Sequence, residues 1–170
     1  LPGGQAGLAV ALGGVGVTLE DLVQAYAALA RGGQAVALAH RPGGPEEGRR
    51  VTSRAAAWQV GHALAGLPPP AGAAQMRLAW KTGTSYGHRD AWALGWDGRH
   101  VAGVWIGRPD GTPVPGAFGA DLAAPVLFRV FERLGGAAPL PPPPPTALIA
   151  PTAALPQPLQ RFRPRGAVFG

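Results

Sequence analysis

A pair of short apolar segments joined by a tight turn limits what this chain can fold into more than any other feature. Residues 91–96 and 100–106 have the length and composition of β-strands, and the Asp97-Gly98 dipeptide between them favours a two-residue hairpin turn. One face of this predicted hairpin carries Trp92, Leu94, Trp96, Val101 and Trp105, and the other carries Ala91, Ala93, Gly95, Ala102, Val104 and Ile106. Since both faces are apolar, the sheet must be covered on both sides.

Helices are predicted in three places. The first is expected to begin at Thr18, with Asp21 as its capping-box partner, and to end at the glycines 32–33. A second is expected over residues 53–65, and a third over residues 121–134. The third is expected to pack on the small-residue face of the hairpin through Leu122, Val126, Val130 and Leu134. The predicted fold class is therefore α+β, with an antiparallel sheet flanked by helices.

The composition changes from residue 137 onward. Residues 141–145 are five consecutive prolines, and further prolines follow. This pattern predicts an extended polyproline-type linker over residues 137–160, after a folded domain over residues 1–136. A ligand for a proline-recognition domain is the alternative interpretation of the same segment. Residues 161–170 are interpreted as the possible start of another, truncated domain.

Composition and charge exclude several classes of function. The chain has no cysteine, which excludes disulfides and thiolate metal sites. Its formal net charge is +6, but the arginines are scattered and no aromatic residues interleave with them, so nucleic-acid binding is not expected. The four histidines, His40, His62, His88 and His100, are not at metal-ligand spacing. No metal or other cofactor is therefore expected. No apolar run approaches the ~20 residues that a membrane-spanning helix needs.

A single lysine marks the most informative motif. Of the 15 basic residues, Lys81 is the only lysine, and it opens the run Lys81-Thr82-Gly83-Thr84-Ser85. The lysine ammonium is a compact hydrogen-bond donor, whereas the arginine guanidinium is a broad planar fork, so the two are not interchangeable in a tight site. The surrounding residues 77–84 alternate in character and predict a third strand beside the hairpin, with Thr82 and Thr84 on one side and Lys81 and Gly83 on the other.

This motif suits the binding of an extended peptide that ends in a carboxylate. A strand edge can pair with such a peptide by β-augmentation, and Gly83 removes a side chain that would obstruct its approach. Lys81 supplies fixed positive charge, while Thr82 and Thr84 supply hydroxyl groups. A backbone N–H just after Gly83 is placed to polarise a carbonyl under attack. Ser85 and Tyr86 complete the predicted substrate-binding residues, with Tyr86 at the mouth of the site.

The motif and its surroundings resemble the transpeptidase domain of class A penicillin-binding proteins, particularly of the 1C type. The matching segments occur in the family's order and cover roughly residues 7–134. They are residues 13–18 leading into the helix 19–30, Lys81-Thr82-Gly83, Arg89-Asp90-Ala91-Trp92 followed by Gly95-Trp96, residues 103–111, and Ala123-Ala124-Pro125. The resemblance implies a penicillin-binding transpeptidase or β-lactamase-like fold, incomplete at its N-terminus, with residues 1–136 as the C-terminal portion of the domain.

The resemblance also implies a reaction and a location. A serine acyl-enzyme would cross-link peptidoglycan stem peptides, and β-lactams would acylate the same serine. Lys81 would hold the substrate carboxylate and influence proton transfer, Thr82 and Thr84 would hydrogen-bond the carboxylate, and the Thr84 N–H would form half the oxyanion hole. The intact protein would be periplasmic, anchored to the membrane by an N-terminal segment outside this sequence, with a glycosyltransferase domain further upstream.

Two motifs of this family are absent from the sequence. Ser-x-x-Lys is impossible because Leu78 stands three positions before the only lysine. Ser-x-Asn is impossible because the chain has no asparagine. The chain is therefore expected to be an inactive fragment of an active transpeptidase. The alternatives are a non-catalytic domain that binds peptidoglycan or a partner protein, and a related D-Ala carboxypeptidase or β-lactamase.

Overall fold

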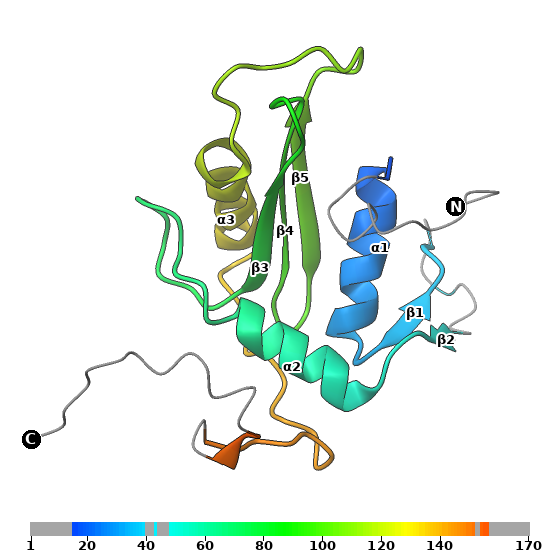
Figure 1. The fold of residues 1–170 in the computed structure, drawn as a ribbon. Helices are drawn as coiled ribbons and strands as arrows, with labels where there is room; N and C mark the ends of the chain where they lie inside the picture. The colour runs from blue at the N-terminus through cyan, green and yellow to red at the C-terminus, as the bar shows by residue number, and fades with distance from the viewer. Residues whose placement is uncertain (1–14, 40–42, 44–47, 152–153, 157–170) are drawn as a thin grey trace, which may run out of the picture.

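The computed structural model describes residues 15–39, 43, 48–151 and 154–156, and these form an α+β structure (Figure 1). In chain order its elements are α1 (Leu19–Ala30), β1 (Gln34–Val36), β2 (Gly48–Arg50), α2 (Arg54–Leu64), β3 (Ala79–Thr84), β4 (Asp90–Trp96), β5 (Val101–Gly107), the π-helical turn η2 (Gly119–Ala123) and α3 (Ala124–Arg133). The predicted fold class, an antiparallel sheet flanked by helices, is thereby confirmed.

The central sheet is antiparallel, with the strand order β3-β4-β5. Trp96 pairs with Val101 and Trp92 with Trp105, so the large and small residues occupy the two faces as predicted. The predicted position of the turn was wrong by one residue. Asp97 N–H donates to the His100 carbonyl, which makes Gly98 and Arg99 the central pair. The Asp97 carboxylate causes this shift because it accepts the amide hydrogens of Arg99 and His100.

The two faces of the sheet are covered by α1 and α3, which lie on opposite sides of it in Figure 1. On the large-residue face, a Cβ added to Gly103 would lie 2.8 Å from both Leu19 and Val23 of α1. On the small-residue face, the rings of Trp80 and Phe128 meet edge to face at 5.1 Å. Gly103 on one face and the alanines on the other thus let α1 and α3 approach the backbone of the sheet closely.

The predicted buried stripe of the third helix was wrong. Helix α3 does cover the small-residue face, but the residues it buries are Ala124, Leu127, Phe128 and Phe131. Three of the four aliphatic residues expected there are exposed, Leu122 at 38%, Val126 at 41% and Leu134 at 49%, and Val130 is half-buried. The spacing i, i+3, i+4, i+7 is equally helical, and it places the two phenylalanine rings over the small residues, where their volume is needed.

The ends of α1 and α2 follow the predicted signals. The Thr18 hydroxyl accepts the Asp21 amide hydrogen at 3.1 Å, and the Asp21 carboxylate accepts the Thr18 amide hydrogen at 3.1 Å. These hydrogen bonds from Thr18 hold the pKa of Asp21 below its usual value. Gly32 and Gly33 have φ of 66° and 89°, which ends the helix. Ser53 caps α2 through Ala56 N–H at 3.1 Å.

Two short strands were not predicted. Strands β1 and β2 pair as a separate two-stranded sheet, with Gln34 opposite Arg50. Each of these strands has only three residues, and β2 is Gly-Arg-Arg, so neither shows the apolar alternation that predicts a strand. No helix among the described residues is long and apolar enough to span a bilayer. The division at residue 136 stays a prediction, and residues 161–170 lie outside the described part of the chain.

Candidate functional site at the outer edge of strand β3

Strand β3 lies at the edge of the central sheet, paired with β4 on one side. No other strand among the described residues pairs with its outer side. Ser85 N–H donates to the Asp90 carbonyl at 3.1 Å, just beyond the paired strands. In an antiparallel ladder, residues that exchange backbone hydrogen bonds with the partner strand alternate with residues that do not, so Gly83 and Lys81 also form backbone hydrogen bonds with β4. The backbone groups of Thr82 and Thr84 consequently face the outer edge.

The Lys81 ammonium lies at the same outer edge. Its Nζ donates to the Thr82 carbonyl oxygen at 2.7 Å. The side chain is exposed, and no carboxylate of the described residues forms a salt bridge with it. An ammonium carries three donor hydrogens, so two stay available to a ligand. Residue 81 thus places positive charge beside an open strand edge.

The Thr84 hydroxyl is fixed from the opposite face of β3. Its oxygen accepts the Gly119 amide hydrogen at 3.1 Å, which leaves the hydroxyl hydrogen free to be donated. A Cβ at Gly119 would lie 2.5 Å from the Gly83 carbonyl oxygen and 2.6 Å from that of Trp92. Only glycine fits this position. Gly119 was missed by sequence reasoning, since its place before a predicted helix is the one signal the sequence offers.

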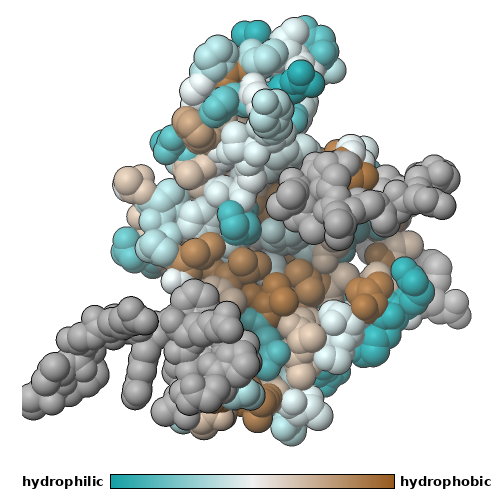
Figure 2. Space-filling model, in the orientation of Figure 1, coloured by the Kyte–Doolittle hydropathy of each residue, from teal (hydrophilic) through white to brown (hydrophobic). Residues whose placement is uncertain are grey.

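The turn that follows β3 is held by its own hydrogen bonds. Ser85 Oγ accepts the Asp90 amide hydrogen at 2.8 Å, and Asp90 Oδ1 accepts the Trp105 indole hydrogen at 2.8 Å. The His88 carbonyl accepts the Val114 amide hydrogen at 2.9 Å, which fastens the loop 108–118 beside the turn. Tyr86 stands at the turn with 99% of its surface exposed. This upper end of the molecule presents mostly hydrophilic surface in Figure 2.

The predicted site residues therefore fall into two groups. Lys81, Thr82 and Thr84 are brought together along one strand edge, with Gly83 between them. Ser85 belongs to the turn, where its oxygen accepts the Asp90 amide hydrogen, and Tyr86 projects into solvent without a ring partner among the described residues. A cavity of about 770 Å³ lies elsewhere, next to Arg77 and Trp96 at the other end of the sheet. The described residues contain no cluster of three side chains suited to a metal ion.

Comparison with known proteins identifies relatives of one class, the penicillin-binding proteins. The chain is 48% identical over 139 residues to penicillin-binding protein 1C of Escherichia coli K12, a match that covers 79% of the chain. It is 44% identical over 61 residues to penicillin-binding protein 1B of Vibrio cholerae, and 47% identical over 49 residues to penicillin-binding protein 1B of Haemophilus influenzae. No protein-family model matches it. The chain is therefore related to the class A penicillin-binding proteins 1B and 1C.

The relatives are much longer than the matching segments. The matches span 18% of the Escherichia coli protein, 8% of the Vibrio cholerae protein and 6% of the Haemophilus influenzae protein. The chain therefore corresponds to less than a fifth of the length of these curated relatives.

Proposed function

We propose that this chain is part of a peptidoglycan D,D-transpeptidase, and that the outer edge of β3 binds the substrate in its active site. One observation carries the proposal: the Lys81 ammonium, the Thr82 carbonyl and the Thr84 N–H share the outer edge of β3, with which no other described strand pairs. The kinship with penicillin-binding proteins 1C and 1B supports it. Residues 1–136 then belong to the C-terminal portion of a transpeptidase domain.

Each group at the edge has a role in this proposal. The acyl-donor stem peptide lies along β3 as an added strand, with its terminal D-Ala carboxylate near Lys81. Two hydrogens of the Lys81 ammonium and the hydroxyl hydrogen of Thr84 are free to bind that carboxylate. Hydrogen bonds to charged groups contribute about 1.5–3 kcal/mol each. Tyr86, at the turn, contacts the more distant part of the peptide.

The Thr84 N–H faces outward, where the attacked carbonyl lies. A serine supplied from outside these 170 residues attacks the carbonyl of the penultimate D-Ala, and the negative charge that develops on the carbonyl oxygen is stabilised by this N–H. The peptide C–N bond then breaks, and the terminal D-Ala leaves with a proton. An amine of a second stem peptide next attacks the acyl-enzyme, and the serine is released. β-Lactams react with the serine in the same way, and their carboxylate binds at Lys81.

This reaction takes place in the periplasm, so we propose that the intact protein works at the outer face of the cytoplasmic membrane. A membrane anchor and a glycosyltransferase domain belong to other parts of that protein in this proposal. The absence of Ser-x-x-Lys from the chain favours one other candidate, a domain that binds peptidoglycan without catalysis. The two candidates differ in whether a penicillin becomes covalently attached.

The test is the rate at which a labelled penicillin acylates the complete protein that contains this chain. Lys81→Ala is expected to lower that rate by about 10- to 100-fold, because a charged hydrogen bond to the drug carboxylate is lost. Arg129→Ala is the matched control, since it removes an exposed positive charge from α3, a helix that contacts β4 and β5. The transpeptidase assignment is overturned if the complete protein is not acylated, and the role of Lys81 is overturned if both variants react at the wild-type rate.

A further inference from the structure

The proline-rich segment after α3 lies against helix α2. Trp58 Nε1–H donates to the Pro141 carbonyl oxygen at 3.2 Å, and Gln59 Nε2 donates to the Leu148 carbonyl oxygen at 3.4 Å. Between these two contacts the Ala147 amide hydrogen is donated to the Pro144 carbonyl at 2.9 Å, which bends the segment back towards α2. Neighbouring residues of one helix thus bind carbonyls that are seven positions apart in the segment.

The start of the segment is fastened to the turn between β4 and β5. Asp97 Oδ2 accepts the Ala138 amide hydrogen at 2.8 Å, and the Gly98 N–H donates to the Ala138 carbonyl at 3.2 Å. A Cβ at Gly98 would lie 2.1 Å from the Pro139 carbonyl oxygen, so the segment passes over a position that only glycine can fill. Asp97 is 3% exposed.

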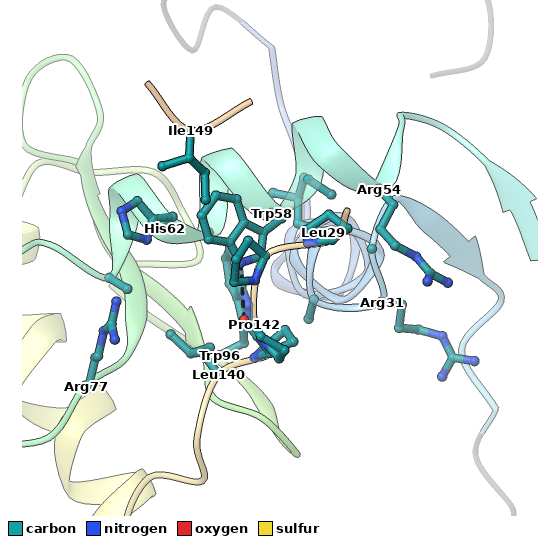
Figure 3. A pocket seen from close by; sticks show the side chains of 18 of the residues that line it. Leu29, Arg31, Arg54, Trp58, His62, Arg77, Trp96, Leu140, Pro142 and Ile149 are labelled. Carbon is teal, nitrogen blue, oxygen red and sulfur yellow. Dashed lines mark hydrogen bonds between the residues drawn. The ribbon is translucent and has the colours of Figure 1, made fainter. Parts of the chain in front are cut away.

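Aromatic rings face the prolines across the cavity of about 770 Å³. Trp58 and His62, one helical turn apart on α2, stack at 4.8 Å with an interplanar angle of 20°. Figure 3 shows Trp58 with Pro142 and Leu140 across from it and Trp96 beside them, whereas Arg31 and Arg54 extend away from the rings. Residues 141–145 all line the cavity. The walls are thus aromatic on one side and proline on the other.

We propose that Trp58, His62 and Trp96 form a recognition groove for a polyproline-type ligand, and that residues 139–149 of the same chain are its ligand. A proline run has no internal hydrogen bonds and presents its carbonyls to donors such as an indole N–H. Its restricted backbone also loses little entropy on binding. A flexible linker would need none of these contacts, whereas this segment has hydrogen bonds at both ends.

Attachment in the same chain has a consequence for competing ligands. The short tether gives the segment an effective concentration in the millimolar range. A proline-rich peptide from another protein must displace the chain's own segment before it can occupy the groove.

The test measures solvent exchange of the Trp58 indole hydrogen by NMR in the 170-residue chain, with a Trp58→Phe variant to assign its signal. Replacing prolines 141–145 by glycine and serine at constant length is expected to speed this exchange by about fivefold, because a hydrogen bond is lost. Adding a synthetic peptide of residues 137–150 to that variant is expected to slow the exchange again. The Trp105 indole hydrogen, which is donated to Asp90, reports that the sheet is still folded in each variant.

The matched control replaces the other proline run, Pro68-Pro69-Pro70, which does not line the cavity. This control is expected to leave the Trp58 exchange rate unchanged. The proposal is overturned if replacing residues 141–145 leaves the rate at its wild-type value while Trp105 stays protected. The wild type is also measured at several protein concentrations. If protection of the Trp58 indole hydrogen falls as the protein is diluted, the segment in the groove comes from a second copy, and its assignment to the same chain is overturned.

Discussion

The Gly119 amide hydrogen is donated to the Thr84 hydroxyl oxygen over 3.1 Å, although 35 residues separate the two in sequence. This hydrogen bond fastens the end of β3 to the beginning of the η2–α3 helical segment, at the place where the candidate site opens. The position of the Thr84 backbone therefore depends on how closely the chain at Gly119 can approach the sheet.

Gly119→Ala is expected to destabilise the protein and to displace the β3 edge. The new Cβ would lie 2.5 Å and 2.6 Å from two backbone carbonyl oxygens, which cannot rotate away as a side chain would. We expect a loss of about 1–3 kcal/mol in the free energy of unfolding, measured by denaturant titration. Gly16→Ala is the control, since nothing lies within 4 Å of the added Cβ there. Equal stability of the two variants would contradict the close approach at Gly119.

The buried stripe of α3 can be checked with a pair of substitutions on the same helix. Phe128→Ala removes a ring that is 1% exposed and packs against Trp80, so we expect a loss of about 3–5 kcal/mol in the free energy of unfolding. Val126→Ala changes a side chain that is 41% exposed, and its effect should stay within about 0.5 kcal/mol. If Val126→Ala proved the more damaging change, α3 would pack through the aliphatic stripe predicted from the sequence.

Local patterns predicted much of this fold. The capping box at Thr18, the end of α1 at Gly32 and the two faces of the β4–β5 hairpin each depend on residues close together in sequence, and each was found in the structure. The α3 stripe was not predicted, because two stripes of that helix have helical spacing. Only the partner surface, with its small residues and Trp80, decides which of them is buried.

The candidate site was predictable only in part, for a related reason. The motif drew attention to Lys81, Thr82 and Thr84 because their residue types suggest chemistry. Which backbone groups point outward depends on the register of β3 against β4, which a sequence does not state. The contact of Thr84 with Gly119 and that of Trp58 with Pro141 join distant segments through single hydrogen bonds, and no local pattern encodes them.

Asp97 is expected to make the stability of the protein depend on pH in the acidic range. Burial alone would raise the pKa of Asp97, but the amide hydrogens of Ala138, His100 and Arg99 and the His100 side chain outweigh this and hold the pKa below its usual value. A depressed carboxyl pKa contributes stability above the unfolded value of about 4, and this contribution is lost as the pH falls through the folded value.

The check is the free energy of unfolding of wild type and Asp97→Asn between about pH 2 and pH 7. The wild type should lose stability as the pH falls below about 4, whereas the variant should show a shallower decline because its amide does not titrate there. At pH 7 the variant should be less stable by about 1–3 kcal/mol, since the single oxygen of asparagine cannot replace both carboxylate oxygens, and its NH2 group cannot accept the amide hydrogen that the second oxygen accepts. Parallel pH curves for the two proteins would show that another carboxylate is responsible.

The outward-facing N–H of Thr84 can be tested apart from the Thr84 hydroxyl. Thr84→Ala removes the hydroxyl and keeps the N–H, whereas Thr84→Pro removes both. Proline is tolerated here because this N–H makes no ladder bond to β4 and edge strands accept proline. If the N–H stabilises the developing oxyanion, Thr84→Pro in the complete protein should be acylated by a labelled penicillin about 100- to 1,000-fold more slowly than Thr84→Ala. Denaturant unfolding of both variants verifies that they are folded. If the two folded variants are acylated at equal rates, the Thr84 N–H does not stabilise the oxyanion.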